Sequence, residues 1–108
     1  MPRGKSLDEN QLTDSMYYIL ISLIEPVHGY GIKQKIFDES DGKVEIGPAS
    51  MYTILKKLQT RELITLLDPD GDRRKTYQIS ESGKKLLKLD IERRIQMAEI
   101  GKKLLHKL

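Results

Sequence analysis

Residues 47–60 have the sequence GPASMYTILKKLQT, which gives the strongest indication of the kind of fold that the chain adopts. Pro48 suits the first turn of a helix, because that position needs no backbone N–H donor. The apolar residues recur at helical spacing and share one face, which holds Met51, Ile54, Leu55 and Leu58. The polar side carries Ser50, Thr53, Lys57 and Thr60, flanked by Lys56 and Gln59. The pattern predicts an amphipathic helix whose polar face meets either a partner or only solvent.

A two-stranded hairpin is predicted directly after this helix. Residues 63–67 and 76–79 have strand-like composition, and the Asp70-Gly71 step between them is a strong hairpin signal. The second limb begins with three cations, Arg73, Arg74 and Lys75. Cations on a hairpin are suited to contact nucleic-acid phosphates. The alternative is that they only neutralise the acidic run at 68–72 that precedes them.

Two shorter helices and a brief strand are predicted upstream. The first helix begins after Thr13, a good N-cap, and ends before Pro26. A turn-rich junction leads into a second helix over about 30–39, and the alternating triplet 44–46 is read as a strand. Residues 1–11 contain few apolar side chains and are expected to form a flexible basic arm.

Residues 81–108 are predicted to form one long helix, which the segment SES at 80–82 opens and caps. Its apolar residues form two stripes, one starting at Leu87 and the other at Met97. One stripe is expected to cover the first helix, and the other to meet a second copy of the chain, because so small a core cannot bury so long a helix. The alternative is that the whole helix folds back on its own chain. The residues predicted at a dimer interface are Met16, Leu87, Ile91, Ile95, Met97, Ala98, Ile100 and Leu104.

Length and composition limit the classes of protein open to the chain. Its 108 residues suit one domain, and a net charge of +3 permits nucleic-acid binding without requiring it. The absence of cysteine excludes disulfides and cysteine-based metal sites. The apolar stretch at 17–24 is too short to cross a bilayer, so we expect a cytoplasmic protein without a membrane partner.

Motifs for catalysis or metal binding are not found in the sequence. A calcium-binding loop beginning at Asp68 would need glycine and glutamate where Arg73 and Ile79 stand. His28 and His106 lie far apart, and neither has an evident catalytic partner. We therefore expect neither an enzyme nor a bound metal or cofactor.

The order of the predicted elements is typical of a winged helix-turn-helix protein. We expect a mostly α protein with a small β-wing: an arm over 1–11, a winged helix-turn-helix DNA-binding domain over 12–80 and a C-terminal dimerisation helix over 81–108. In this fold the third helix enters the major groove of double-stranded DNA, and the hairpin touches the flanking backbone. The residues predicted from their positions to bind DNA are Ser50, Thr53, Lys56, Lys57, Arg73, Arg74 and Lys75.

The chain also resembles the PadR family, in its short branch, over nearly its whole length. The matching motifs are LT at 12–13, MYYIL at 16–20, HGYGI at 28–32, GPASMY at 47–52, LKKL at 55–58, RRKTY at 73–77 and SESG at 80–83. The resemblance implies a homodimeric transcriptional regulator, in most members a repressor, with its recognition helix at 48–60. It also implies that Tyr52 contacts the DNA backbone. The spacing of apolar residues alone is equally compatible with a Tyr52 ring that packs inside the protein. Some members are released from DNA by a small aromatic effector.

These expectations lead to one function and one main alternative. The expected function is occupancy of a pseudo-palindromic operator by a homodimer whose recognition helices lie about one helical turn of DNA apart. The alternative is a winged-helix module that binds other proteins, in which case affinity for DNA is weak and unspecific.

Overall fold

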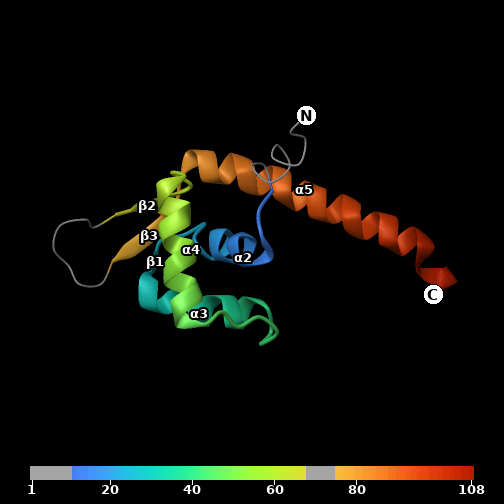
Figure 1. Cartoon of the computed structure of the whole chain (residues 1–108), viewed down its shortest axis with the longest axis horizontal. Helices are drawn as coiled ribbons and strands as arrows, with labels where there is room; N and C mark the ends of the chain where they lie inside the picture. The colour runs from blue at the N-terminus through green and yellow to red at the C-terminus, as the bar shows by residue number, and fades with distance from the viewer. Residues whose placement is uncertain (1–10, 68–74) are drawn as a thin grey trace.

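The computed structural model describes residues 11–67 and 75–108, which form a small helical domain with a three-stranded sheet and a long C-terminal helix (Figure 1). The elements are α2 (Asp14–Ser22), β1 (Val27–His28), α3 (Gly29–Glu39), α4 (Pro48–Thr60), β2 (Ile64–Leu66), β3 (Thr76–Ile79), α5 (Glu81–Leu104) and a short 3-10 helix, η1 (Leu105–Lys107). The strands are antiparallel in the order β1-β3-β2. The predicted mostly α fold with a small β-wing and a long last helix is confirmed.

The helices begin at the residues that their caps predict. The Thr13 hydroxyl accepts a hydrogen bond from the Met16 N–H at 3.1 Å at the start of α2. The Ser80 hydroxyl accepts one from the Gly83 N–H at 3.0 Å at the start of α5. Pro48 occupies the first turn of α4, as its fixed φ favours. A side-chain cap therefore fixes the start of α2 and of α5, and Pro48 fixes the start of α4.

One hydrophobic core joins all the helices to the sheet. Helix α2 contributes side chains with no solvent exposure, Ile19 and Leu20, and α3 contributes Ile32. The predicted buried face of α4 is confirmed, since Met51, Leu55 and Leu58 are buried and Ile54 is half-buried. Because this face is held by the core, the opposite side of α4 is presented outward.

The third strand of the sheet is not the one that the sequence predicts. Residues 44–46 form no strand, and the edge of β3 opposite β2 is taken by Val27, paired with Tyr77, and by His28, paired with Thr76. A strand needs a neighbour to satisfy its backbone groups, and this edge is already occupied. Ile46 is nevertheless buried, so alternation in 44–46 reflects side-chain burial without strand pairing.

The start of α5 packs tightly against the turn between α4 and β2. The hydroxyls of Ser80 and Ser82 both donate hydrogen bonds to the Glu62 carbonyl, at 2.7 and 2.9 Å. A Cβ atom added at Gly83 would collide with the backbone carbonyl of Leu63. Only glycine therefore allows this close approach of helix and turn.

A buried carboxylate joins α5 to the start of α2. Asp90 has a side chain with no solvent exposure and binds Arg94 Nε at 2.6 Å and Arg93 Nη2 at 2.9 Å. Arg94 also donates to Asp14 at 2.9 Å and to the Leu12 carbonyl at 3.1 Å. Burial raises the pKa of Asp90, but hydrogen bonds from the two arginines and from the Leu12 N–H outweigh it, so the net pKa is lowered.

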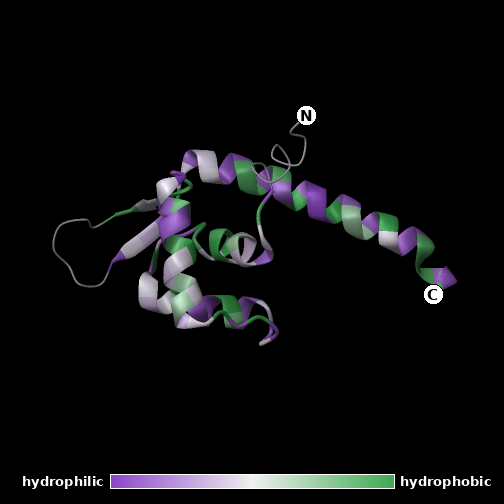
Figure 2. Ribbon diagram, viewed as in Figure 1, coloured by the Kyte–Doolittle hydropathy of each residue, from purple (hydrophilic) through white to green (hydrophobic). Residues whose placement is uncertain are grey.

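Beyond Arg94 the remainder of α5 extends away from the core. Every residue from Ile95 to Leu108 is exposed, and the helix projects past the other elements (Figure 1). Figure 2 shows hydrophobic residues along this projecting half up to its end. Within residues 11–67 and 75–108, no helix has the length and apolar character needed to cross a membrane.

Candidate nucleic-acid interface

The outward side of α4 is polar and free of carboxylates. Ser50, Tyr52, Thr53, Lys56 and Lys57 are all exposed, as the predicted DNA-contacting face requires. Residues 48–60 contain two lysines and no aspartate or glutamate, so nothing on this helix repels a phosphate. The Thr53 hydroxyl donates to the Ala49 carbonyl at 3.0 Å, which leaves its oxygen to accept a further hydrogen bond.

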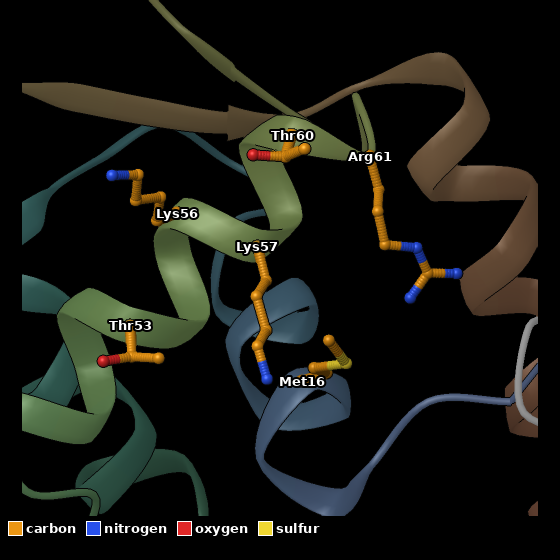
Figure 3. A pocket seen from close by; sticks show the side chains of 6 residues that line it. All are labelled: Met16, Thr53, Lys56, Lys57, Thr60 and Arg61. Carbon is orange, nitrogen blue, oxygen red and sulfur yellow. The ribbon is translucent and has the colours of Figure 1, made fainter.

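The two lysines of α4 leave the helix in different directions. Lys57 extends toward Met16 of α2, whereas Lys56 points away from α2 (Figure 3). Lys57 borders a cavity of about 480 Å³ whose other lining residues are Met16, Thr53, Lys56, Thr60 and Arg61. Helical spacing places Lys57 on the same face as Ser50 and Thr53. It does not show that α2 lies beside this face and that Lys57 extends toward it.

The aromatic residue of α4 is at the surface. Tyr52 is 66% exposed, so its ring is not packed in the core. It borders a second, smaller hollow with Tyr30 and Lys33 of α3. The N-termini of α3 and α4 both border this hollow, since Gly29 and Pro48 also line it. Exposed tyrosine hydroxyls and a lysine beside two helix N-termini are groups that bind phosphate oxygens in DNA complexes.

Tyr30, Lys33 and His28 become candidates for the interface only in the folded structure. Tyr30 is 67% exposed and its ring stacks on His28, with centroids 5.4 Å apart. The Nδ1 atom of His28 lies 2.9 Å from the Thr76 hydroxyl, which connects α3 to the base of the hairpin. Their signal in the sequence is a cluster of aromatic and basic residues at 28–33, but the glycines within it predict only a turn between helices.

The base of the hairpin lies beside the start of α3. Lys75 is exposed, and its carbonyl accepts a hydrogen bond from the Gly29 N–H at 2.9 Å. The Leu67 N–H donates to the Thr76 carbonyl at 2.8 Å, so the two limbs stay paired up to the last described residue before the tip. Arg73 and Arg74, and the acidic run before them, lie outside the described residues, and their role remains a prediction.

The residues predicted at a dimer interface divide into two groups. Leu87 and Met16 are buried at 4% and 9% exposure within their own chain, and Ile91 is half-buried against the same core. The others lie on the projecting half of α5 and are exposed, namely Ile95, Met97, Ala98, Ile100 and Leu104. The stripe that starts at Leu87 therefore covers α2 only with its first half, whereas its second half, Ile95 and Ala98, and the stripe that starts at Met97 have no cover among the described residues.

Clusters of metal-binding side chains do not occur in the part of the chain that the structure describes. The described surface around α4 therefore offers hydroxyls, amines and aromatic rings for binding.

Comparison with known proteins agrees with this fold. The family model described as "Transcriptional regulator PadR-like family" matches residues 18–89. The chain is similar to the crystal structure of a PadR-like transcriptional regulator from Bacillus cereus, with 26% identity, a TM-score of 0.64 and coverage of 94% of this chain and 93% of that one. It is also similar to a PadR family transcription regulator from Clostridium difficile, with 21% identity, a TM-score of 0.66 and coverage of 83% and 97%.

A curated protein from Lysinibacillus sphaericus, called uncharacterized protein X, is 29% identical over 76 residues, which cover 68% of this chain and 70% of that protein. The family model spans α4, the described limbs of the hairpin and the first part of α5, which are the elements that carry the features described above. Its members are transcriptional regulators and not enzymes. The resemblance seen in the sequence motifs is confirmed, and the chain belongs to the PadR-like family of transcriptional regulators.

Proposed function

We propose that the chain is a homodimeric repressor that occupies a pseudo-palindromic operator with one α4 helix in each half-site. The observation that carries this proposal is the outward side of α4, which exposes hydroxyls, a tyrosine and lysines on a helix without a carboxylate. A helix of this kind, held by a core on its other face, fits the major groove.

The contacts are assigned by side-chain chemistry. Ser50 and Thr53 contact base edges or phosphates, since hydroxyls serve both. Lys56, which points away from α2, contacts phosphate (Figure 3). Tyr52, Tyr30 and the exposed Lys75 contact the flanking backbone, and Arg73 and Arg74 extend that contact along the wing.

The second copy is proposed to pack against the projecting half of α5. Ile95, Met97, Ile100 and Leu104 are each between 50% and 60% exposed. Exposed apolar side chains repeated along one helix are typical of a surface that another subunit covers. A symmetric pairing of two such helices then places two α4 helices on one face of the dimer.

The family resemblance also implies release from DNA by a small effector. An effector lowers operator affinity only if it binds the DNA-free state more tightly than the DNA-bound state. A thermal-shift screen would detect such a compound as a rise in melting temperature that is matched by a loss of operator affinity. A screen that yields no compound with both effects would contradict this part of the proposal.

The function is tested by titrating the protein into labelled DNA from upstream of its own gene at several salt concentrations, beside an unrelated fragment of equal length. We expect selective binding that weakens steeply with salt, because several phosphates are neutralised. Equal and weak binding to both fragments would contradict the proposal and favour a protein-interaction module.

A further inference from the structure

Helix α5 is attached to the rest of the chain at two places along its first half. Its start lies against the turn after α4, where Gly83 allows the close approach of the Leu63 carbonyl. The second place is Arg94, about 16 Å further along the helix. Arg94 is also the last residue of α5 that is partly buried, since every residue from Ile95 onward is exposed. Two points of attachment define a line, so the second one sets the angle at which the rest of α5 projects.

Arg94 connects α5 to the segment that enters α2. Its guanidinium binds Asp90 Oδ2 of its own helix at 2.6 Å. It reaches across to the Leu12 carbonyl at 3.1 Å and to Asp14 Oδ1 at 2.9 Å, and it lies over the Tyr17 ring, 4.2 Å from the centroid. Figure 1 shows that this segment begins beside α5 and leads down into α2. One side chain therefore joins the middle of α5 to the start of α2.

The apolar contacts between α5 and α2 hold the helices together without fixing their angle as strictly. Leu87 is buried and Ile91 is half-buried in the shared core. Apolar attraction depends on the area removed from water and has no preferred direction. A guanidinium is planar, and its N–H groups point in fixed directions. A tilt of α5 therefore breaks the hydrogen bonds of Arg94, whereas the apolar side chains can rearrange.

The neighbouring arginine binds the same carboxylate but does not reach α2. Arg93 donates to Asp90 Oδ1 from Nε at 3.1 Å and from Nη2 at 2.9 Å, and its Nη1 lies 3.1 Å from Met97 Sδ. Within residues 11–67 and 75–108, the hydrogen bonds of Arg93 thus all end in α5. The side chains of Arg93 and Arg94 have similar exposed fractions, 29% and 24%. Arg93 is therefore a matched control for the contacts that Arg94 makes with the start of α2.

We propose that Arg94 is a positioning residue: it fixes the angle between α5 and the rest of the chain, and it thereby selects the spacing of the operator half-sites. This inference rests on the proposed function, in which the exposed half of α5 meets a second copy. Residues 95–104 extend about 15 Å beyond Arg94, so a tilt of about 10° moves their end by about 3 Å. Successive base pairs of DNA are about 3.4 Å apart, so such a tilt in each subunit shifts the two α4 helices along DNA by about one base pair.

The angle is tested within one chain and without DNA. The chain has no cysteine, so Gln59→Cys on α4 and Lys103→Cys on the projecting part of α5, both at exposed positions, accept two spin labels without background. The labelled chain is mixed with an excess of unlabelled chain, and electron-electron double resonance measures the distance between its two labels. We expect the same narrow distribution with wild-type Arg94 and with Arg93→Gln. Arg94→Gln should broaden it or displace its mean by about 3 Å or more.

A third variant separates the angle from stability. Arg94→Lys keeps a positive charge beside Asp90, but one ammonium cannot keep the fixed directions of the guanidinium. Its unfolding midpoint in urea should lie closer to wild type than that of Arg94→Gln, while its distance distribution stays broad. A wild-type distribution in Arg94→Gln would overturn the proposal. Equal broadening in Arg93→Gln would also overturn it, because loss of any partner of Asp90 would then have the same effect.

The effect on DNA is measured with operator fragments whose two half-sites are moved one base pair closer together, left unchanged or moved one base pair apart. Wild type and Arg93→Gln should bind one spacing several-fold more tightly than the others, whereas Arg94→Gln should bind all three about equally. A preserved preference in Arg94→Gln would overturn the proposal and leave the DNA-binding function standing. A broadened distance distribution in Arg94→Gln, together with no selective DNA binding by wild type, would support the angle set by Arg94 and contradict the proposed function.

Discussion

Replacing Asp90 with asparagine should strongly destabilise the fold. The carboxylate is fully buried, and its two oxygens accept hydrogen bonds from Arg93, Arg94 and the Leu12 N–H. Asparagine has nearly the same shape, but it turns one acceptor oxygen into an NH₂ donor that faces a guanidinium and removes the negative charge. The change therefore tests the electrostatic interaction with little change in packing.

The magnitude follows from the burial of the partners. Breaking a buried ion pair by removing one member costs about 3–5 kcal/mol. The Arg93 and Arg94 side chains keep 29% and 24% of their exposure and recover some hydration, so we expect a loss of about 2–4 kcal/mol in the free energy of unfolding. Urea unfolding followed by circular dichroism at pH 7 and fixed protein concentration measures it.

A nearby exposed carboxylate provides the control. Glu92→Gln, two residues further along α5 at an exposed position, should change the free energy of unfolding by no more than about 0.5 kcal/mol. An equally small change in the free energy of unfolding for Asp90→Asn would contradict the prediction. The ion pairs of Asp90 with Arg93 and Arg94 would then not stabilise the junction of α5 and α2.

Further predictions concern acid stability, backbone contact, DNA binding and assembly. Because the folded pKa of Asp90 is lowered, its contribution is present above the unfolded value of about 3.9 and is lost as pH falls through the folded pKa, so the stability gap between wild type and Asp90→Asn should narrow in acid urea titrations. Gly83→Ala should strongly lower the melting temperature, whereas Gly101→Ala, in open space on α5, should stabilise the helix by about 0.5–1 kcal/mol; equal effects would contradict the close contact. Lys56→Gln should reduce the salt slope of operator binding by about 1, with wild-type stability, and an unchanged slope would remove Lys56 from the interface. Ile100→Glu should convert the proposed dimer to a folded monomer in sedimentation velocity, and a persistent dimer would exclude the exposed apolar residues of α5 as the interface.

The sequence predicts correctly those features of a helix that depend on its own residues, such as its buried face and its first residue. The spacing of Met51, Leu55 and Leu58 predicted the buried face of α4, and the hydroxyls of Thr13 and Ser80 predicted where α2 and α5 begin. These features depend on neighbours a few residues away, which the sequence displays directly.

Features that depend on distant residues were not predictable in the same way. The strand at Val27–His28 exists because β3 offers it an edge, and the triplet at 44–46 has better alternation but no such partner. Asp90 is one of four acidic residues in the last helix, and the sequence alone does not show that the start of α2 packs against it. The direction of Lys57 likewise depends on the position of Met16, about forty residues earlier in the chain.

Hydroxyl-radical footprinting on DNA from upstream of the gene tests whether the two α4 helices of the proposed dimer occupy neighbouring segments of the major groove. We expect two protected segments related by two-fold symmetry, with centres about 34 Å, or one helical turn, apart. Lys56→Gln should weaken the protection of both segments equally. A single protected segment, or uniform protection without defined edges, would contradict the claim.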